Sequence, residues 1–410
     1  MTHEVVRSPA AGEALASAAL AVAAATPAVM VLSRGVAPVM LALAASLLIF
    51  AALASGRHGE ARGRLSGFAR APAGLVAIAA AAYMILSLLW TPALARGAEF
   101  TGHVLGSATL AAVALASLSA TALGRGVRHG WLAALVGACA VLVLIELRAG
   151  SPLRSALGGG IEAFRLNRAA VAIVLFLPLA ATLLVAHGQR LAAGALGIVA
   201  ATAVFASQSE SAKLALLVAL AAWSLARYAP RAAPPALGAA VIGTLLAVPA
   251  IAPAVNALVP QALHEAIGYG TLGIRGEIWT RYAWLIAERP ILGHGMEAGH
   301  VTAQLLAGTM DARDLGLLDF GHPHNFALQV WFELGLIGVG FAAVLLGLAV
   351  RAVSRAPGRL RPAAMATAAA IWTVAFVSHG AWQAWWWCLV GLVALLFAAS
   401  ARGFGEAKAA

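Results

Sequence analysis

Residues 169–187 read AAVAIVLFLPLAATLLVAH, an apolar run that contains no Asp, Glu, Lys or Arg. About 20 apolar residues in a helix, rising 1.5 Å each, cross the roughly 30 Å of hydrocarbon in a bilayer. Within lipid, a single segment satisfies all of its backbone donors and acceptors only as a helix. The run therefore predicts a membrane-spanning helix.

The composition of the whole chain points the same way. Its 410 residues are 62% hydrophobic and 10% charged, whereas roughly 25% of residues carry charge in a soluble domain. There are 27 Lys and Arg against 16 Asp and Glu, for a formal net charge of +11. The basic residues punctuate the apolar runs and do not gather on one polar face, which argues against a nucleic-acid partner. Cys139 and Cys388 both lie inside apolar runs, so we expect no disulfide framework and no cysteine-based zinc site.

We predict an all-α polytopic membrane protein with about 12 transmembrane helices, because the chain contains twelve such runs. They lie near 14–32, 36–55, 73–91, 102–123, 130–147, 169–187, 191–207, 211–227, 235–255, 326–350, 362–379 and 382–400. The first run follows Glu4, Arg7 and Glu13 rather than a basic segment, so we interpret it as a retained helix. The predicted organisation is nine helices in 1–255, one large loop in 256–325, and three helices with a short tail in 326–410.

The distribution of basic residues predicts the orientation, because short loops rich in Lys and Arg stay in the cytoplasm. With both termini in the cytoplasm, 16 of the 27 Lys and Arg residues fall on that side. Most exceptions fall in two outer segments, 148–168 and 256–325. Cations held on the unfavourable side predict an anionic partner on the outer face.

The 256–325 loop holds seven of the 16 acidic residues, and loops this long usually carry function. Within it, residues 277–288 predict an amphipathic helix ended by Pro290. Its apolar positions are Ile278, Trp279, Tyr282, Leu285 and Ile286. Such a helix can lie flat at the outer interface with its indoles among the headgroups.

The motif His322-Pro323-His324-Asn325 stands directly before the tenth run. Proline keeps His322 out of the α region, so we expect an extended segment with both histidines on the same side. Asn325 is a good N-cap for the following helix, which places His324 near a helix N-terminus. The helix dipole and partial desolvation both disfavour an imidazolium there, so a neutral His324 that acts as a general base is predicted.

Two other interpretations of the histidine pair stay open. Both rings could be interfacial residues in ordinary hydrogen bonds, because an H-x-H pair is a weak signal. The alternative is a metal site, since further ligand types occur in the same loop. These are His294, His300, Asp311, Asp314 and Asp319. They show no tight ligand spacing, so no metal is predicted.

Cations stand near the outer ends of three predicted elements, at Arg168, Lys213 and Arg275. Arginine or lysine at membrane depth costs a few kcal/mol on insertion scales, so its retention indicates a partner. For Lys213, snorkelling to the interface is the simpler account. Guanidinium groups pair well with phosphate oxygens, so several of them would suit a lipid-linked diphosphate.

Four tryptophans open the last run, at Trp382, Trp385, Trp386 and Trp387. Indoles favour the membrane interface, so we expect an aromatic belt. Stacking on sugar rings is the alternative.

Three motifs occur in order: RGEIW at 275–279, ERPILGHG at 288–295 and HPHNFALQVWFELGLIG at 322–338. Together they resemble the signature of the O-antigen ligase and polymerase superfamily. This block covers about 265–340, and the span number with one large outer loop before a late span is also similar to that family. Asn167-Arg168 and Ser207-Gln208-Ser209 are weaker matches.

The resemblance implies a C-class membrane glycosyltransferase on the periplasmic face of the bacterial inner membrane. The family moves a glycan from undecaprenyl diphosphate to an acceptor hydroxyl, with inversion and without a metal or cofactor. The implied base is His324, and the implied ligand of the diphosphate is Arg275. The family often has an arginine after its Ser-x-Ser, where this chain has Glu210, so Lys213 is expected to supply the missing charge. The further substrate-binding residues that we predict are Arg168, His322, Arg281 and Asn325.

The leading prediction for the acceptor is lipid A-core, which makes the protein an O-antigen ligase. Polymerases of the family tend to have two sizeable outer loops, and this sequence has one. A polymerase that uses a second lipid-linked glycan and a protein O-glycosylating enzyme stay open. A polysaccharide or lipid transporter is a further alternative, but it would be expected to show an internal repeat with charges near mid-membrane, and the sequence shows neither.

Overall fold

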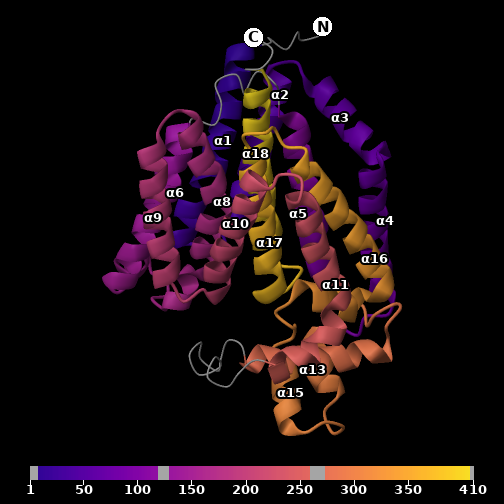
Figure 1. Ribbon diagram of the computed structural model, residues 1–410. Helices are drawn as coiled ribbons and strands as arrows, with labels where there is room; N and C mark the ends of the chain where they lie inside the picture. The colour runs from indigo at the N-terminus through magenta and orange to yellow at the C-terminus, as the bar shows by residue number, and fades with distance from the viewer. Residues whose placement is uncertain (1–7, 119–128, 259–272, 407–410) are drawn as a thin grey trace.

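The computed structural model describes residues 8–118, 129–258 and 273–406. Their regular structure is helical (Figure 1), apart from one isolated bridge between Ala307 and Met310. Ten of the described helices are long and apolar enough to span a membrane. They are α1 (Pro9–Leu32), α2 (Ala37–Ala54), α4 (Pro72–Leu86, extended by the 3-10 turn Ser87–Leu89), α5 (Leu94–Ser117), α6 (His129–Arg148), α8 (Asn167–Ala186), α10 (Glu210–Tyr228), α11 (Ala233–Leu258), α16 (Phe326–Ser354) and α18 (Ala384–Glu406).

The protein is therefore a polytopic membrane protein, as predicted, but the count of about 12 spans is met only in part. Two of the twelve predicted runs, 191–207 and 362–379, form the shorter apolar helices α9 (Arg190–Ala206) and α17 (Arg361–Val377). The remaining short elements are α3 (His58–Arg70), α7 (Pro152–Ala156), a 3-10 turn (Ala163–Leu166), α14 (Gly299–Leu305) and α15 (Ala312–Leu318). The predicted 256–325 loop is only partly covered, because its residues 259–272, Glu265 included, lie outside the described residues.

The centre of the bundle is α8, the helix that contains the run 169–187. Its side chains from Ala169 to Phe176 are at most 2% exposed. It packs against α1, α6, α9, α10 and α17. A helix that is apolar all round and buried in this way fixes the position of its own first turn, where Asn167 and Arg168 stand.

Helix α13 (Gly273–Glu288) lies across one end of the bundle, with α15 beyond it (Figure 1). The predicted helix over 277–288 is thus present, and it begins four residues earlier. Its five predicted apolar positions are all at most 6% exposed. The expected headgroup contact is wrong for Trp279, because its indole is buried and donates to the carbonyl of Pro323 (2.8 Å). Trp284, on the opposite face, is exposed.

Helix α16 is broken at Gly335, whose φ of 60° and ψ of −163° are not helical. The segment 290–295 fills the break. Its amides at His294 and Gly295 each donate to a carbonyl of α16 (2.8 Å in both cases), and the amide of Leu336 donates back to the first carbonyl of the segment (2.8 Å). Backbone groups freed by the break are therefore paired, as a buried backbone requires. The first three turns of α16 are held in place by this exchange.

Candidate active site

A cavity of about 340 Å³ lies where the first turns of α8, α10, α13 and α16 meet the segment 378–383. It is lined by Arg34, Phe164, Arg165, Asn167, Arg168, Val171, Gln208, Ser209, Glu210, Ser211, Arg275, His324, Ser378, His379, Gln383 and Trp385. His324, Arg275 and Arg168, three of the predicted site residues, thus share one cavity although more than 150 positions separate Arg168 from His324.

His324 stands just before α16 in a left-handed conformation, with φ 52°. The extended arrangement predicted for residues 322–324 is therefore wrong at this position. Asn325 is the N-cap of α16, as predicted, and its side chain accepts from the amide of Leu328 (3.0 Å). The left-handed turn bends the chain so that His324 reaches toward segment 378–383 while Asn325 still caps the helix.

The protonation of the His324 ring follows from its contact with a carbonyl. Its Nδ1 lies 3.2 Å from the carbonyl oxygen of Ser378. A carbonyl oxygen only accepts, so Nδ1 carries the proton and donates, and Nε2 keeps its lone pair. Burial lowers the pKa of His324 below its usual 6.5, and the positive charge of Arg275 acts in the same direction. A neutral ring with a free Nε2 has the properties that a general base needs.

Two further histidines surround this ring. The ring centroids of His322 and His324 are 4.2 Å apart, and the His324 amide donates to Nδ1 of His322 (3.2 Å). Burial lowers the pKa of His322 to about 3 and that of His379 to about 4. Both are therefore neutral at pH 7. His379, which lines the cavity, was not predicted; the only available signal was a histidine at the junction of two apolar runs.

Positive charge collects on one side of the cavity. Arg275 donates to the carbonyl of Val377 (2.7 Å), and burial lowers its pKa, although the nearby Glu210 acts in the opposite direction. Arg168 donates to the carbonyl of Arg34 (3.0 Å) and lies 4.5 Å above the ring of Trp385. Among the described residues, no carboxylate forms an ion pair with Arg275, Arg168 or Arg34. Their charge is available to an anion.

Lys213 is not among the residues that line the cavity. Its Nζ pairs with Oε1 of Glu210 (2.7 Å), so the lysine neutralises the one acidic side chain at the cavity wall. The expectation that Lys213 itself reaches the diphosphate therefore needs correction. The additional cations that the structure places there are Arg34 and Arg165, and Arg165 is paired with Glu162.

Three other predicted substrate ligands, His322, Arg281 and Asn325, are also absent from the cavity lining. His322 packs against His324, as described above. Arg281 pairs with Asp314 (2.6 Å) and lies 4.4 Å from the ring centre of Trp284. Asn325 is fully buried in its capping role. Arg281 therefore anchors α15 on α13, and Asn325 sets the start of α16; neither contacts the cavity.

The residues considered as metal ligands take other roles. His294 stacks on Phe332 (4.5 Å between centroids) and its Nε2 lies 2.9 Å from the carbonyl of Leu285. Asp311 caps α15. Within residues 8–118, 129–258 and 273–406, no three His, Cys, Asp or Glu side chains are grouped so that they could hold a metal ion. Metal independence stays a prediction about activity.

The expected aromatic belt is wrong for three of its four tryptophans. Trp382, Trp385 and Trp386 are at most 7% exposed. The Trp385 indole donates to Oε1 of Gln383 (2.6 Å), and the partly buried Trp387 donates to the carbonyl of Ala381 (2.8 Å). These rings therefore support segment 378–383 from within.

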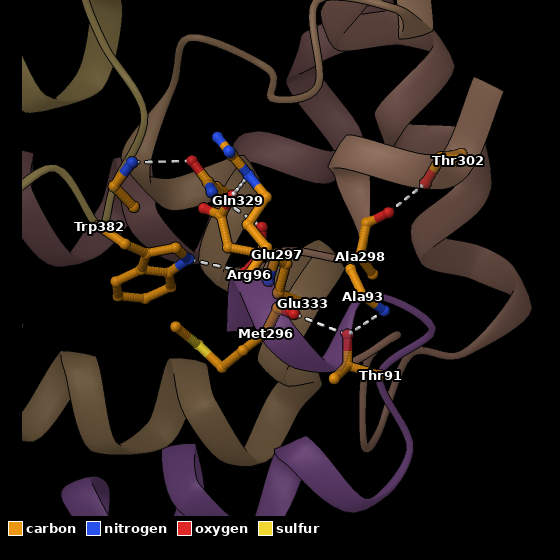
Figure 2. A network of polar contacts seen from close by, with 11 residues as sticks. Thr91, Ala93, Arg96, Met296, Glu297, Ala298, Thr302, Gln329, Glu333 and Trp382 are labelled. Atoms are coloured by element: carbon orange, nitrogen blue, oxygen red, sulfur yellow. Dashed lines mark hydrogen bonds and ion pairs between the residues drawn. The ribbon is translucent and has the colours of Figure 1, made fainter. Parts of the chain in front are cut away.

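The buried carboxylate of Glu333 connects that segment to α16 and to the chain around Glu297 (Figure 2). Glu333 is 1% exposed. Its Oε1 accepts from Nε2 of Gln329 (2.8 Å), and its Oε2 accepts from the amide of Glu297 (2.7 Å) and from the indole of Trp382 (2.6 Å). One residue of α16 thereby holds two other parts of the chain, at Glu297 and Trp382, against its own helix.

The same network extends to both sides. Gln329 accepts from the amide of Ala381 through Oε1 (2.8 Å), next to the cavity residues His379 and Gln383. On the other side, Arg96 of α5 pairs with Glu297 (2.7 Å). Gln329 and Glu333 both stand inside the motif at 322–338, but neither was predicted as a site residue. Their (i, i+4) spacing on an otherwise apolar helix was the signal for this pairing.

The fold and this cavity define a class: a multi-pass helical membrane protein with a buried cationic site and a neutral histidine at one end of its bundle. Residues 195–343 match the family model described as O-antigen ligase, so this part of the chain is similar to that family. The matched segment contains His324 and Arg275, whereas Arg34, Arg168 and segment 378–383 lie outside it.

Two relatives agree with this assignment. A protein of Rickettsia conorii named "Putative polysaccharide ligase" is 27% identical over 128 residues, which are 28% of this chain and 29% of the relative. A protein of Rickettsia prowazekii with the same description is 28% identical over 120 residues, which are 28% of this chain and 30% of the relative. The matched part of the chain thus spans less than a third of the length of these curated relatives.

Proposed function

We propose that this protein is an O-antigen ligase that transfers a glycan from undecaprenyl diphosphate to a hydroxyl of lipid A-core. The observation that carries the proposal is the free Nε2 of a neutral His324 in the same cavity as Arg275 and Arg168. The proposed transfer needs a proton acceptor and positive charge that no carboxylate pairs, and the described residues provide both in one cavity. The family match and the polysaccharide ligase relatives support glycan transfer.

In the proposed step, the acceptor oxygen attacks the anomeric carbon while its proton passes to Nε2 of His324. The bond between that carbon and the diphosphate oxygen breaks, and the electron pair leaves with the diphosphate. Attack opposite the leaving group inverts the anomeric centre. Negative charge grows on the diphosphate, and Arg275 and Arg168 stabilise it electrostatically.

In this proposal, residues at the cavity wall orient the base and set the charge of the cavity. Ser378, through its carbonyl, holds the His324 ring so that Nε2 points away from that contact. Glu210, neutralised by Lys213, leaves the cavity with net positive charge. A volume of about 340 Å³ is in the range of small-ligand sites, so it suits the diphosphate and the reacting sugar, and the remaining glycan extends outside.

The proposed orientation places this cavity at the periplasmic face of the inner membrane. Support comes from the opposite end of the bundle, where Arg190 at the start of α9, Arg227 in the last turn of α10 and Arg361 at the start of α17 line one cavity. Arginine-rich short loops favour the cytoplasm. The arginines of the first cavity are then the exceptions to this rule, as an anion-binding site would require.

The test is transfer by the purified full chain in liposomes that contain an undecaprenyl-diphosphate-linked glycan and lipid A-core. We expect core-linked glycan, and His324→Ala should lower the rate by about 10²- to 10⁴-fold. His300→Ala is the matched control, because this exposed histidine of the same region is not among the residues that line the cavity.

Each outcome is decisive for one part of the proposal. Equal loss in both histidine variants, or full turnover by His324→Ala, rejects the base. Elongated glycan that stays on the carrier lipid, with no labelled core, rejects lipid A-core as acceptor in favour of polymerisation.

A further inference from the structure

A second and larger cavity, of about 1090 Å³, lies between α8, α9, α10 and α17. Its wall is mostly apolar, with Leu177 and Pro178 from α8, and Leu216, Leu220 and Trp223 from α10. Gly194 of α9 and Leu220 of α10 are exposed, so the cavity opens sideways between these two helices. In a bilayer, a sideways opening between spanning helices faces lipid.

Four arginines line the same cavity at one end. They are Arg190 at the start of α9, Arg227 in the last turn of α10, and Arg359 and Arg361 at the start of α17. No carboxylate of the described part of the chain pairs with any of them. The Nε of Arg361 is buried and has no hydrogen-bond partner among the described residues. The end of the cavity is therefore complementary to an anion with several oxygens.

This cavity lies at the other end of the bundle from the candidate active site. Arg168 lines the first cavity and Ala186 lines the second, and both belong to α8. The 18 residues between them rise about 27 Å, close to the roughly 30 Å of bilayer hydrocarbon. A diphosphate bound at Arg168 and Arg275 cannot also reach the four arginines.

The apolar part of the cavity matches one leaflet in depth. On α10 its lining runs from Leu216 to Arg227, a rise of about 16 Å. Half of the hydrocarbon thickness is about 15 Å. An acyl chain lying along this wall would therefore end near mid-membrane while its headgroup meets the arginines.

We propose that this cavity binds an anionic phospholipid, with its phosphate among Arg190, Arg227, Arg359 and Arg361 and an acyl chain between α9 and α10. Cationic pockets between membrane helices on the cytoplasmic side recognise anionic headgroups on the same physical grounds. Bound lipid would fill the gap between α9 and α10, which touch each other over only a short length.

The test titrates the purified full chain in detergent with phosphatidylglycerol and follows the midpoint of thermal unfolding. Parallel titrations use phosphatidylethanolamine, inorganic phosphate and undecaprenyl phosphate. We expect stabilisation by phosphatidylglycerol at the lowest concentration. An equal effect of phosphatidylethanolamine, of phosphate alone or of undecaprenyl phosphate overturns the assignment to an anionic phospholipid.

Two kinds of variant test the site itself. Replacing both Arg227 and Arg361 by Gln should raise the half-saturating lipid concentration about 5-fold for each charge removed. The control replaces Arg351 and Arg355 by Gln, because these two arginines are exposed at the end of α16 and do not line the cavity. This control should leave the half-saturating lipid concentration unchanged.

The second variant fills the apolar part and leaves the charges intact. Gly194→Leu places a side chain in open space at the cavity wall, whereas Gly197→Leu does so on the same helix away from it. We expect the first substitution, and not the second, to weaken the response to phosphatidylglycerol. Unchanged half-saturation in both the double-arginine and the Gly194 variants overturns the proposal.

Discussion

Replacing Glu333 by alanine should destabilise the protein more than any other single change in its polar network. The carboxylate is 1% exposed and accepts three hydrogen bonds, from Gln329, the amide of Glu297 and the indole of Trp382. Alanine leaves all three donors buried without an acceptor. A donor left in this state costs about 1–3 kcal/mol. Gln329 is itself buried and its Oε1 already accepts from the amide of Ala381, so its NH₂ group cannot simply turn away. All three donors therefore count, and we expect a total of about 3–9 kcal/mol.

Two milder substitutions give the ordering that identifies this cause. Glu333→Gln keeps the shape but presents an NH₂ group to donors, so it should destabilise by about 1–3 kcal/mol. Glu297→Gln keeps the backbone amide that Glu333 needs and removes only the ion pair with Arg96. The side chain of Glu297 is 8% exposed, but that of Arg96 is 39% exposed, so water can hydrate the guanidinium once the pair is lost. We therefore expect this substitution to cost about 1 kcal/mol.

The assay is thermal unfolding of the full chain in one detergent and at one lipid content, with Glu297→Gln as the matched control. The midpoint should fall in the order Glu333→Ala, Glu333→Gln, Glu297→Gln, with the largest drop first. An alanine variant that unfolds no earlier than Glu297→Gln would refute the reasoning, because the three donors would then have found other partners.

Three further predictions concern the cavity and the break in α16. Transfer activity should fall as the pH drops, because His324 becomes protonated. Burial lowers the pKa of His324, so the pH profile of the rate should have its midpoint below 6.5 and a plateau at pH 7. A midpoint above 6.5 would contradict the buried neutral base. Arg275→Lys removes a donor that can bind phosphate oxygens in a bidentate way, so kcat/KM for glycan transfer should fall about 10- to 100-fold. The matched control, Arg281→Lys, should keep a kcat/KM near that of the wild type, because Arg281 lies outside the cavity. Gly335→Ala should lower the midpoint of thermal unfolding, because the φ of Gly335 is positive and a Cβ there would overlap the backbone of Ile291. Gly340→Ala on the same helix places its Cβ in open space, so this control should be neutral or stabilising. Equal midpoints for the two variants would refute the strain argument.

Local sequence was sufficient for several features of the site. The N-cap at Asn325, the helix that contains Trp279, and a neutral His324 all follow from short-range rules, because capping and helical periodicity act within one or two turns. Desolvation, one of the two causes expected from the sequence, is the main reason for the lowered pKa of His324; the contact with the Ser378 carbonyl opposes it, and the Arg275 charge acts in the same direction as burial.

Other features depended on residues distant in the chain. Lys213 was expected to replace the arginine that the family has at the position of Glu210, and Arg281 was predicted as a further substrate ligand. In the fold, Glu210 and Asp314 pair with these two cations. His379 could not be recognised, since its position at the cavity results from the packing of segment 378–383.

By itself the sequence determined that the chain is helical and crosses the membrane many times, because apolar runs of about 20 residues have no other way to satisfy their backbone in lipid. The motifs also carried the likeness to O-antigen ligases. Only the tertiary structure decided which cations share a cavity with His324, that the tryptophans of α18 turn inward, and that α16 breaks at Gly335. These outcomes depend on contacts between segments far apart in the chain, such as the hydrogen bond between Tyr83 and Leu334, which are 251 residues apart. No local pattern encodes the distance between two such segments.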